Sequence, residues 1–359
     1  MQPLAYAYYA YLALVSLSFL GLMALNLRRT GHAARYPKSD VSPSCLVIAP
    51  CKGVDIGLGD NLSSLASQDY QGKCKFVAVV DSEDDLAVTY IKSAGLDFLV
   101  SDQHGNGSGK VRAIASAITH YPDADIYVVA DSDVRFPKDW LQKLVAPFSD
   151  EKVGVSTAYP LFKPVGGFWS KVKMVWGLVG NGLMESELTR FSWGGSMAFR
   201  ASLMQGAGME SFSKSLSDDI AITRLAKSRG MSIAYVPDAH ISVDTDDNFA
   251  MFSEWANRQT ALTLLGYRKN FTYGMLFYGA SILVFLSAIA LTALHGILGA
   301  ILFLPTIIGM AKTYRRVGTP DPMIGIIYIF INFIYVANLV KARRMKSITW
   351  RGRSYGLEQ

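Results

Sequence analysis

The chain has 359 residues, of which 50% are hydrophobic and only 18% are charged, and its mean hydropathy of +0.22 is high for a soluble enzyme. This length allows one or two domains with a substantial core, and the hydropathy predicts membrane segments. The formal net charge is +6, but the middle of the chain carries no basic stripe, which argues against nucleic acid as a partner.

The three cysteines, Cys45, Cys51 and Cys74, form neither a CxxC pair nor a His/Cys metal pattern. Their odd number argues against a disulfide framework. We expect small core residues in a reducing compartment.

The first predicted element is a transmembrane helix over Leu4–Leu27, a charge-free stretch that reaches the roughly 20 residues needed to cross a bilayer. Arg28 and Arg29 follow it, which places that end in the cytoplasm. The stretch has no basic segment before it and no clear small-residue cleavage site, so residues 1–27 are expected to be a retained anchor.

Residues 28–269 alternate strand-like apolar runs with helical patterns, which is typical of an α/β domain with a Rossmann-like parallel sheet. We expect this domain in the cytoplasm. The predicted strands are Cys45–Ala49, Phe76–Val80, Phe98–Val100, Ile126–Ala130, Val155–Ala158 and Ile233–Val236. Pro160–Met184 carries aromatic residues interleaved with lysines, which suits either an amphipathic segment on the bilayer or an ordinary helix packed on the sheet.

Three further apolar segments, Phe271–Leu294, Gly296–Ala311 and Met323–Val340, predict membrane helices over residues 270–341. Basic residues stand both before and after the last segment, so both flanks cannot be cytoplasmic if it crosses once. Either one of the three segments is re-entrant, or the charge rule fails here. We therefore expect a multi-pass membrane protein, and the sequence does not fix how many times the chain crosses.

Residues 342–359 form a basic tail directly after an apolar run, and this predicts contact with anionic lipid headgroups. The basic residues from the end of that run onward are Lys341, Arg343, Arg344, Lys346, Arg351 and Arg353.

Two acidic clusters each follow a predicted buried strand. Asp81 to Asp85 follow Phe76–Val80, and Asp131-Ser132-Asp133 follows Ile126–Ala130. Carboxylates at the carboxyl ends of parallel strands point into the crevice where α/β sheets bind ligands. We expect Asp131 and Asp133 to hold Mg²⁺ or Mn²⁺ on a diphosphate, and Asp81 and Asp85 to meet the nucleoside of a nucleotide-sugar.

A later acidic pair, Asp218-Asp219, opens a helical pattern. Ser217 or Asp218 can cap the helix while the next residue acts as general base toward an acceptor hydroxyl, for which Asp219 and Asp218 are the candidates. His240 follows a predicted strand and is a candidate third metal ligand, although a lone histidine is more often structural.

The segment Gly105 to Lys110 resembles a phosphate-binding P-loop but lacks its first glycine and its Ser or Thr after the lysine. We therefore expect a turn that delivers Lys110 to a phosphate or to the nucleoside. Gly195 lies in the run Trp193-Gly194-Gly195-Ser196, a tight turn where the backbone can approach a sugar closely.

These motifs, in this order, resemble family 2 and 21 glycosyltransferases of the GT-A fold, most closely the ceramide glucosyltransferase group. The resemblance rests on seven motifs in register over nearly the whole chain. They are Cys51-Lys52-Gly53-Val54-Asp55, Asn61-Leu62 with Gln68-Asp69-Tyr70, Asp85, Asp131 with Asp133, Gly194 to Met197, Asp219, and Trp350 to Tyr355.

The resemblance implies a membrane-bound, inverting transferase that moves a hexose, such as glucose from UDP-glucose, onto a lipid hydroxyl. It implies Asp85 and Lys110 at the nucleotide, Asp133 with Asp131 at the metal, and Asp219 as base. Alternatives are a polyprenyl-phosphate glycosyltransferase, a polysaccharide synthase, or an inactive nucleotide-binding scaffold.

One motif departs from the family, which ends its catalytic domain with Q/R-x-x-R-W. Here Met251 and Glu254 stand in place of the first residue and the arginine, while Trp255 is present. We expect Trp255 to shape the acceptor opening, and Arg258, one helical turn later, to reach the diphosphate.

Overall fold

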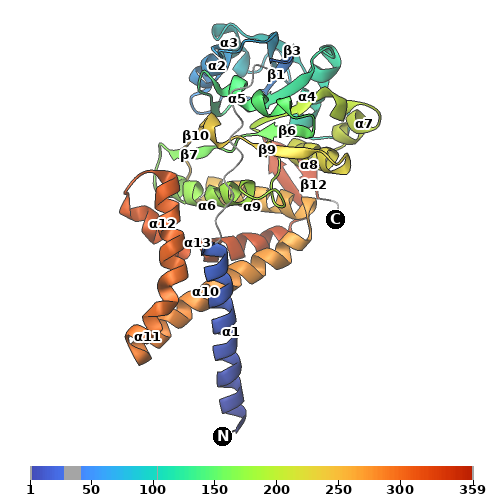
Figure 1. Cartoon of the computed structure of the whole chain (residues 1–359). Coiled ribbons are helices and arrows are strands. Elements are labelled where there is room, and N and C mark those ends of the chain that lie inside the picture. The colour runs from blue at the N-terminus through green and yellow to red at the C-terminus, as the bar shows by residue number, and fades with distance from the viewer. Residues whose placement is uncertain (1, 28–41, 103, 358–359) are drawn as a thin grey trace.

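The computed structural model describes residues 2–27, 42–102 and 104–357. Arg28 and Arg29, on which the predicted orientation of the first helix depends, and Glu358 of the tail lie outside these residues. An α/β domain lies above a layer of helices, and apolar helices run away from that layer (Figure 1).

A seven-stranded sheet with the order β3-β2-β1-β4-β8-β6-β9 forms the centre of the described domain. The first four strands in this order are parallel, as in one half of a Rossmann sheet, and β8 runs antiparallel to both β4 and β6. The strands are β1 Cys45–Pro50, β2 Cys74–Val80, β3 Asp97–Val100, β4 Ile126–Ala130, β6 Val153–Thr157, β8 Ser196–Arg200 and β9 Ser232–Tyr235.

All the strands predicted from the apolar runs are confirmed within one or two residues, but β8 was not predicted. Its first residue, Ser196, directly follows the Gly194-Gly195 turn. The sequence pattern therefore does not separate the start of this five-residue strand from the turn. The turn and the strand are both present.

Both faces of this sheet are covered by helices. Side chains alternate along β1, so Val47 packs into one buried cluster and Ile48 into the cluster on the opposite face. The covering helices are α2 Leu58–Ala66, α3 Ala87–Ser93, α4 Gly109–His120, α5 Trp140–Val145, α7 Gly208–Ser213 and α8 Asp218–Ser228, with short 3₁₀ turns at Ala146–Ser149, Ala201–Met204 and Pro237–Ala239.

A second, three-stranded sheet lies toward the membrane helices, with the order β5-β10-β7. Its strands are β5 Val134–Arg135, β10 Ser242–Thr245 and β7 Leu161–Pro164. Below it lie α6, Phe168–Met184, and α9, Phe249–Gly266 (Figure 1).

Of the two predictions for Pro160–Met184, the packed helix is confirmed. Val172, Val175 and Trp176 of α6 are buried in the core. The indole N–H of Trp176 donates to Asn338, 3.0 Å away on the last long helix, so α6 is covered on that side by protein.

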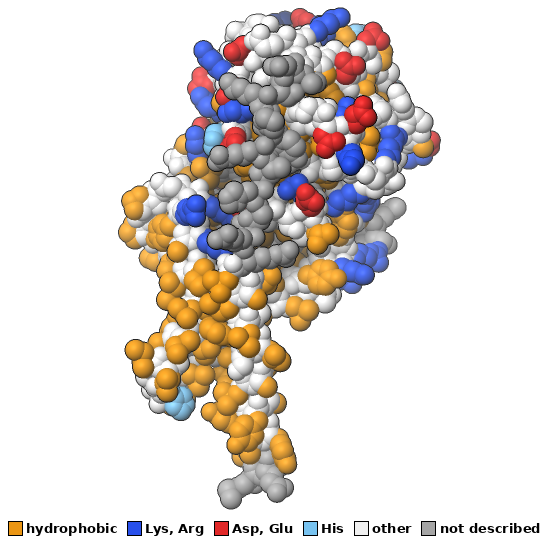
Figure 2. All heavy atoms as spheres, viewed as in Figure 1, with side chains coloured by type: hydrophobic (Ala, Val, Ile, Leu, Met, Phe, Trp, Pro, Cys, Tyr) orange, Lys and Arg blue, Asp and Glu red, His pale blue; other side chains and the backbone are white. Residues whose placement is uncertain are grey.

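Four helical segments are long and apolar enough to cross a membrane in the described part of the chain: Leu4–Leu27, Lys269–His295, Ile297–Val317 and Pro322–Arg344. They correspond to α1 Gln2–Leu27, α10 Lys269–His295, α11 Ile297–Ala300 with α12 Leu304–Val317 and the 3₁₀ turn Ile301–Phe303 between them, and α13 Pro322–Arg344. Hydrophobic side chains gather over α1 and the lower helices, while charged side chains lie over the α/β domain (Figure 2).

The helix α13 differs from the other apolar helices because it lies directly beneath α6 and α9 (Figure 1). Two ion pairs tie the corner between α12 and α13 to α6: Lys171 lies 2.6 Å from Asp321, the residue before α13, and Glu185, the residue after α6, lies 2.6 Å from Arg316 of α12. Both ends of α13 therefore adjoin the same domain, because the chain after α13 returns to it as well.

The tail is a β-hairpin, formed by β11 Ser347–Trp350 and β12 Arg353–Gly356. Its two arginines pair with carboxylates of the α/β domain: Arg351 lies 2.5 Å from Asp55, and Arg353 lies 3.1 Å from Asp81. The prediction that Arg351 and Arg353 face lipid headgroups is therefore wrong. The tail follows an apolar helix, but it folds as a hairpin whose turn, Arg351-Gly352, lies beside Asp55 of the α/β domain.

Candidate active site

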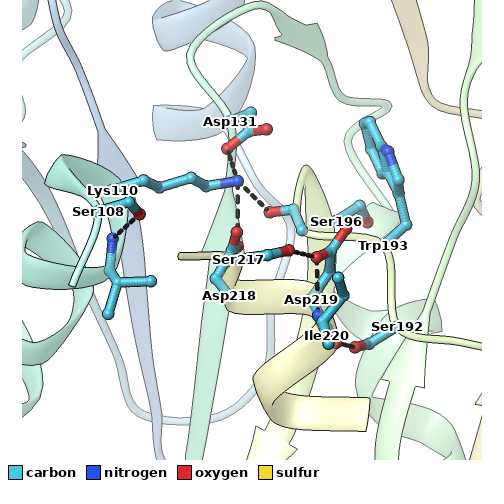
Figure 3. A network of polar contacts seen from close by, with 12 residues as sticks. Ser108, Lys110, Asp131, Ser192, Trp193, Ser196, Ser217, Asp218, Asp219 and Ile220 are labelled. Carbon is cyan, nitrogen blue, oxygen red and sulfur yellow. Dashed lines mark hydrogen bonds and ion pairs between the residues drawn. The ribbon is translucent and has the colours of Figure 1, made fainter. Parts of the chain in front are cut away.

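The predicted acidic motifs converge at one edge of the large sheet. Asp81 follows β2 and Asp131 follows β4, so both lie at the carboxyl edge of the parallel strands. Asp218 begins α8, and the ammonium of Lys110 lies 2.6 Å from Asp131 and 3.1 Å from Asp218 (Figure 3). The Lys110 side chain therefore joins the Asp131–Asp133 motif to the Asp218-Asp219 pair.

The Asp131–Asp133 turn is held by neighbouring polar groups. The Ser132 hydroxyl donates to Asp55 at 2.7 Å, and the Asn61 side-chain amide donates to the Ser132 carbonyl at 3.1 Å. Asn61 is buried in α2 and Asp55 lies in the loop after β1, so these two segments hold Ser132 between the two carboxylates.

Lys110 is positioned by the loop that resembles a P-loop. Ser108 caps α4 by accepting from the Val111 N–H at 3.3 Å, and its own N–H donates to the Ser215 carbonyl at 3.1 Å. An added Cβ at Gly107 would lie 2.4 Å from the Ser213 carbonyl oxygen, so only glycine fits against this segment. The loop thus places Lys110 beside the start of α8.

The ammonium of Lys110 has three N–H donors. They are directed to Asp131, Asp218 and the Gly194 carbonyl, the last at 3.1 Å. Protein oxygens take all three donors here, so Lys110 joins the two acidic motifs.

The Gly194-Gly195 turn approaches the same cluster. An added Cβ at Gly194 would lie 2.5 Å from an Asp218 oxygen and 2.9 Å from the Lys110 nitrogen. At Gly195 it would lie 2.1 Å from the Trp193 ring. Glycine is required at position 195 because the Trp193 indole packs against it. The glycine is therefore explained without a contact to a sugar.

Asp219 lies beside this ion-paired cluster, in the first turn of α8. Its carboxylate accepts from the Ile220 N–H at 2.7 Å and from the Ser217 hydroxyl. Burial, together with the negative charge of Asp218, raises the pKa of Asp219 to about 6. A carboxylate with this pKa is ionised at neutral pH and is a stronger base than an exposed aspartate.

The two carboxylates after β4, Asp131 and Asp133, are the candidate ligands of a divalent cation. Burial raises the pKa of Asp131 to about 7, against the opposing effect of Lys110, and burial with the nearby Asp55 raises the pKa of Asp133. Mg²⁺ is commonly held by one or two carboxylates, with water and substrate phosphates as its other ligands. Asp131 and Asp133 fit a cation that is bound together with a diphosphate.

His240 is exposed, and it lies away from these ligands. Ser242 of β10 pairs with Arg135 and Val243 with Val134, so this register carries the residues before Ser242 away from Asp133. Within residues 2–27, 42–102 and 104–357, no group of three His, Cys, Asp or Glu side chains is arranged to hold a metal ion. The prediction of His240 as a third ligand is wrong.

Asp81 and Asp85 occupy different environments. Lys52 lies 2.9 Å and Arg353 3.1 Å from Asp81, whose side chain is 20% exposed. An oxygen of Asp85 accepts from the Gly53 and Ala87 N–H groups, each at 2.9 Å. Asp85 therefore shapes the loop after β1 and the start of α3, whereas Asp81 lies among the cations at the edge of the sheet.

Trp255 and Arg258 lie on α9. The Trp255 ring contacts Phe162 and Trp176, with ring centroids 5.3 and 4.9 Å away, and the Lys173 ammonium lies 4.8 Å from its centre. Arg258 lies 3.8 Å from Glu254, and its pKa is lowered by burial and by the positive charge of Arg351. Arg258 therefore lies within the electrostatic reach of Arg351 on the C-terminal hairpin.

Four residues at the site were not among the predicted site residues: Lys52, Asp55, Arg351 and Arg353. The signal for them was present in the motifs around Lys52 and Arg351. Lys52 and Asp55 lie in a motif that carries the family resemblance, and the charge of the two arginines after an apolar helix suits lipid headgroups as well as protein carboxylates.

Comparisons with known proteins bear on the family and the fold of the chain. Residues 8–359 match the model of glycosyl transferase family 21. The chain is 33% identical over 156 residues to an N-acetylglucosaminyltransferase of Rhizobium leguminosarum bv. viciae, covering 40% of this chain and 35% of that protein. It is 32% identical over 124 residues to an N-acetylglucosaminyltransferase of Bradyrhizobium elkanii, covering 32% of this chain and 65% of that protein.

The chain therefore matches about a third of the first relative's length and about two thirds of the second's. Among solved structures, it resembles the mannosyltransferase PcManGT from Pyrobaculum calidifontis, determined in complex with GDP-Man and Mn²⁺. That likeness has a TM-score of 0.51 and 17% identity over 91% of this chain and 96% of the other, and it concerns the fold alone. The predicted family and fold are confirmed: the chain belongs to glycosyl transferase family 21, and its α/β domain has the GT-A fold.

Proposed function

We propose that the protein transfers a hexose, with glucose from UDP-glucose as the first candidate, onto the hydroxyl of a membrane lipid with inversion at the anomeric carbon. The observation that carries this proposal is the junction at Lys110, which brings the carboxylate turn after β4 to the carboxylate pair at the start of α8. Departure of a diphosphate is helped by a cation held on carboxylates, and deprotonation of an acceptor hydroxyl needs a carboxylate base. Both kinds of carboxylate are needed side by side.

On the donor side, Asp131 and Asp133 would hold Mg²⁺ or Mn²⁺. The cation would neutralise charge on the departing diphosphate. Lys110 keeps Asp131 in place, and the Ser132 contact with Asp55 keeps the turn from moving as charge develops. Such a preorganised site does not need to reorient during the reaction.

On the acceptor side, Asp219 would remove the proton from the lipid hydroxyl. The bonds from Ser217 and Ile220 fix one of its oxygens, which leaves the other for the acceptor. A single base opposite the leaving group gives direct displacement and therefore inversion.

The lipid would reach this base from the helical layer below the domain. A groove of about 340 Å³ lies between α9 and the end of α13, lined by Phe249, Ala250, Ser253, Glu254, Asn257, Lys341 and Met345. Phe249 is 59% and Met251 50% exposed, so apolar side chains flank the groove on the membrane side of the domain. Trp255, on the same helix, would border the path to Asp219.

N-acetylglucosamine is the second candidate sugar, because two relatives carry the name N-acetylglucosaminyltransferase. Full-length protein in native membranes should be supplied in parallel with radiolabelled UDP-glucose and UDP-N-acetylglucosamine, with Mn²⁺ present. We expect label from one donor in the organic phase. Label that stays in water with both donors and several lipid extracts would refute transfer to lipid.

The protein would be an integral membrane protein with its catalytic domain in the cytoplasm. We propose that α13 lies along the membrane surface and does not cross, because Lys171–Asp321 and Arg316–Glu185 tie its first end, and the hairpin its last end, to one domain. The basic residues at both ends of α13 are then on the cytoplasmic side of the membrane, where basic residues that flank membrane segments are usually found.

This topology can be measured with added cysteines at two exposed positions, Thr319→Cys before α13 and Lys346→Cys after it. An impermeant thiol reagent applied to sealed, right-side-out vesicles should label neither position, and both should be labelled after permeabilisation. The unsubstituted protein gives the background from its own cysteines. Labelling of one position alone in sealed vesicles would mean that α13 crosses.

The pH dependence follows from the raised pKa of Asp219. Only the ionised carboxylate accepts a proton, so kcat/KM should fall about tenfold per pH unit as the pH drops below about 6. Asp218→Asn should move this fall in kcat/KM to lower pH, because the negative charge of Asp218 helps to raise the pKa of Asp219. If kcat/KM falls at the same pH in Asp218→Asn as in wild type, Asp219 is not the group that titrates.

A further inference from the structure

The C-terminal hairpin, Ser347–Gly356, is anchored in the helical layer and reaches up to the carboxylate site. Ile348 and the following Leu357 are buried against Ala261 and Leu264 of α9 and against Ala342 of α13. At the other side of the hairpin, the Tyr355 hydroxyl accepts from the Gly109 N–H at 3.1 Å. The hairpin thus packs between the membrane layer and the first turn of α4.

The tip of the hairpin is a two-residue turn in which both residues have positive φ, Arg351 at 50° and Gly352 at 75°. Turns of this kind favour Asn or Gly at the first position, because other residues are strained there. An arginine at that position is therefore not explained by the turn. Its side chain is explained by its contacts: it donates to the Lys52 carbonyl at 3.2 Å and pairs with Asp55 at 2.5 Å.

Charges at the site show why such a cation is needed. In the described part of the chain, the carboxylates at this edge include Asp55, Asp81, Asp131, Asp133, Asp218 and Asp219. Four of them, Asp55, Asp81, Asp131 and Asp218, form ion pairs with Lys52, Lys110, Arg351 and Arg353. Half of these cations come from the hairpin. Without them, a nucleoside diphosphate would approach a strongly negative edge of the sheet.

The hairpin also lies where the family motif on α9 is altered. Glu254 stands in the arginine position of that motif, and it is paired with Arg258 at 3.8 Å. Ile348 of the hairpin packs in one cluster with Ala261, three residues after Arg258 on α9, and the positive charge of Arg351 contributes to lowering the pKa of Arg258. Two guanidinium groups at this junction of α9 and the hairpin suit a diphosphate, whose charge offsets their repulsion.

We propose that the C-terminal hairpin is part of the donor site, with Arg351, together with Arg258, binding the diphosphate of the nucleotide-sugar. Arg351 supplies from the tail a cation that the altered motif on α9 lacks. Arg353, with Lys52, holds Asp81 toward the nucleoside. The inference rests on the proposed transfer from a nucleoside diphosphate sugar.

The test is calorimetric binding of UDP and GDP, and of uridine by competition, to full-length protein in detergent with Mn²⁺ present. Arg351→Asn is the informative variant, because asparagine suits the turn while the guanidinium is lost. Arg344→Gln is the control: it changes the net charge equally, and Arg344 is exposed at the end of α13. We expect Arg351→Asn to weaken UDP binding about 10- to 100-fold while uridine binding and the control remain as in wild type.

Equal UDP affinity in Arg351→Asn and wild type would overturn the inference and leave the proposed function standing. Tighter UDP binding in Arg351→Asn would also overturn it, since the hairpin would then obstruct the site. A wild-type protein that binds neither UDP nor GDP would overturn both the inference and the proposed donor class.

Discussion

Asp219→Asn should lower the turnover of lipid glycosylation by about 10²- to 10⁴-fold, the usual contribution of a general base. Asparagine has the shape of aspartate, and its oxygen can still accept the bonds from Ser217 and Ile220. The fold and the donor site should therefore remain, and only the basic group is lost. The measurement is transfer of radiolabelled sugar to lipid by membranes that contain equal amounts of each protein.

The matched control is Asp60→Asn. Asp60 also lies in the first turn of a helix, α2, but its side chain is 75% exposed and pairs with Arg135. This variant should retain wild-type turnover. If Asp219→Asn also retains it, Asp219 is not the base, and the acceptor proton must leave by another route.

Lys110→Met should have the largest effect on stability. The Lys110 side chain is only 9% exposed, and its removal leaves Asp131 and Asp218 facing each other without their cation. Breaking a buried ion pair in this way commonly costs about 3–5 kcal/mol. We expect a lower thermal midpoint and loss of transfer, measured on purified protein by thermal unfolding and by the same lipid assay.

Lys214→Met is the control for Lys110→Met, because it removes a lysine from an exposed pair with Glu210, 2.6 Å away. Exposed pairs of this kind contribute little, so its thermal midpoint should match wild type. A Lys110→Met protein with wild-type stability and transfer would show that the acidic motifs do not depend on Lys110.

Much of the donor side could be predicted from local sequence. Five-residue apolar runs define β2 and β4, and in a parallel sheet their carboxyl ends share one edge, so Asp81 and Asp131 are placed together without knowledge of the rest. The position of Asp219 in the first turn of α8 follows in the same way from a helical pattern with acids at its start.

The contacts that complete the site could not be predicted, because they join segments far apart in the chain. A lysine after a glycine-rich loop suits a phosphate as well as a carboxylate, and only the packing of Gly107 against Ser213 directs Lys110 to Asp131 and Asp218. The charges of Arg351 and Arg353 likewise do not say whether their partner is lipid or protein. That is decided by the tight turn and by the anchor at Ile348.

The central claim, transfer of a sugar to a membrane lipid by the convergent carboxylates, is tested most directly by mass spectrometry of lipids from a host that makes no glycolipids. The host should express either the wild-type chain or Asp219→Asn at equal levels. Our account predicts a new lipid, heavier by one sugar residue, in cells with the wild-type chain and its near absence with the variant. No new glycolipid with the wild-type chain, or the same amount with both chains, would contradict it.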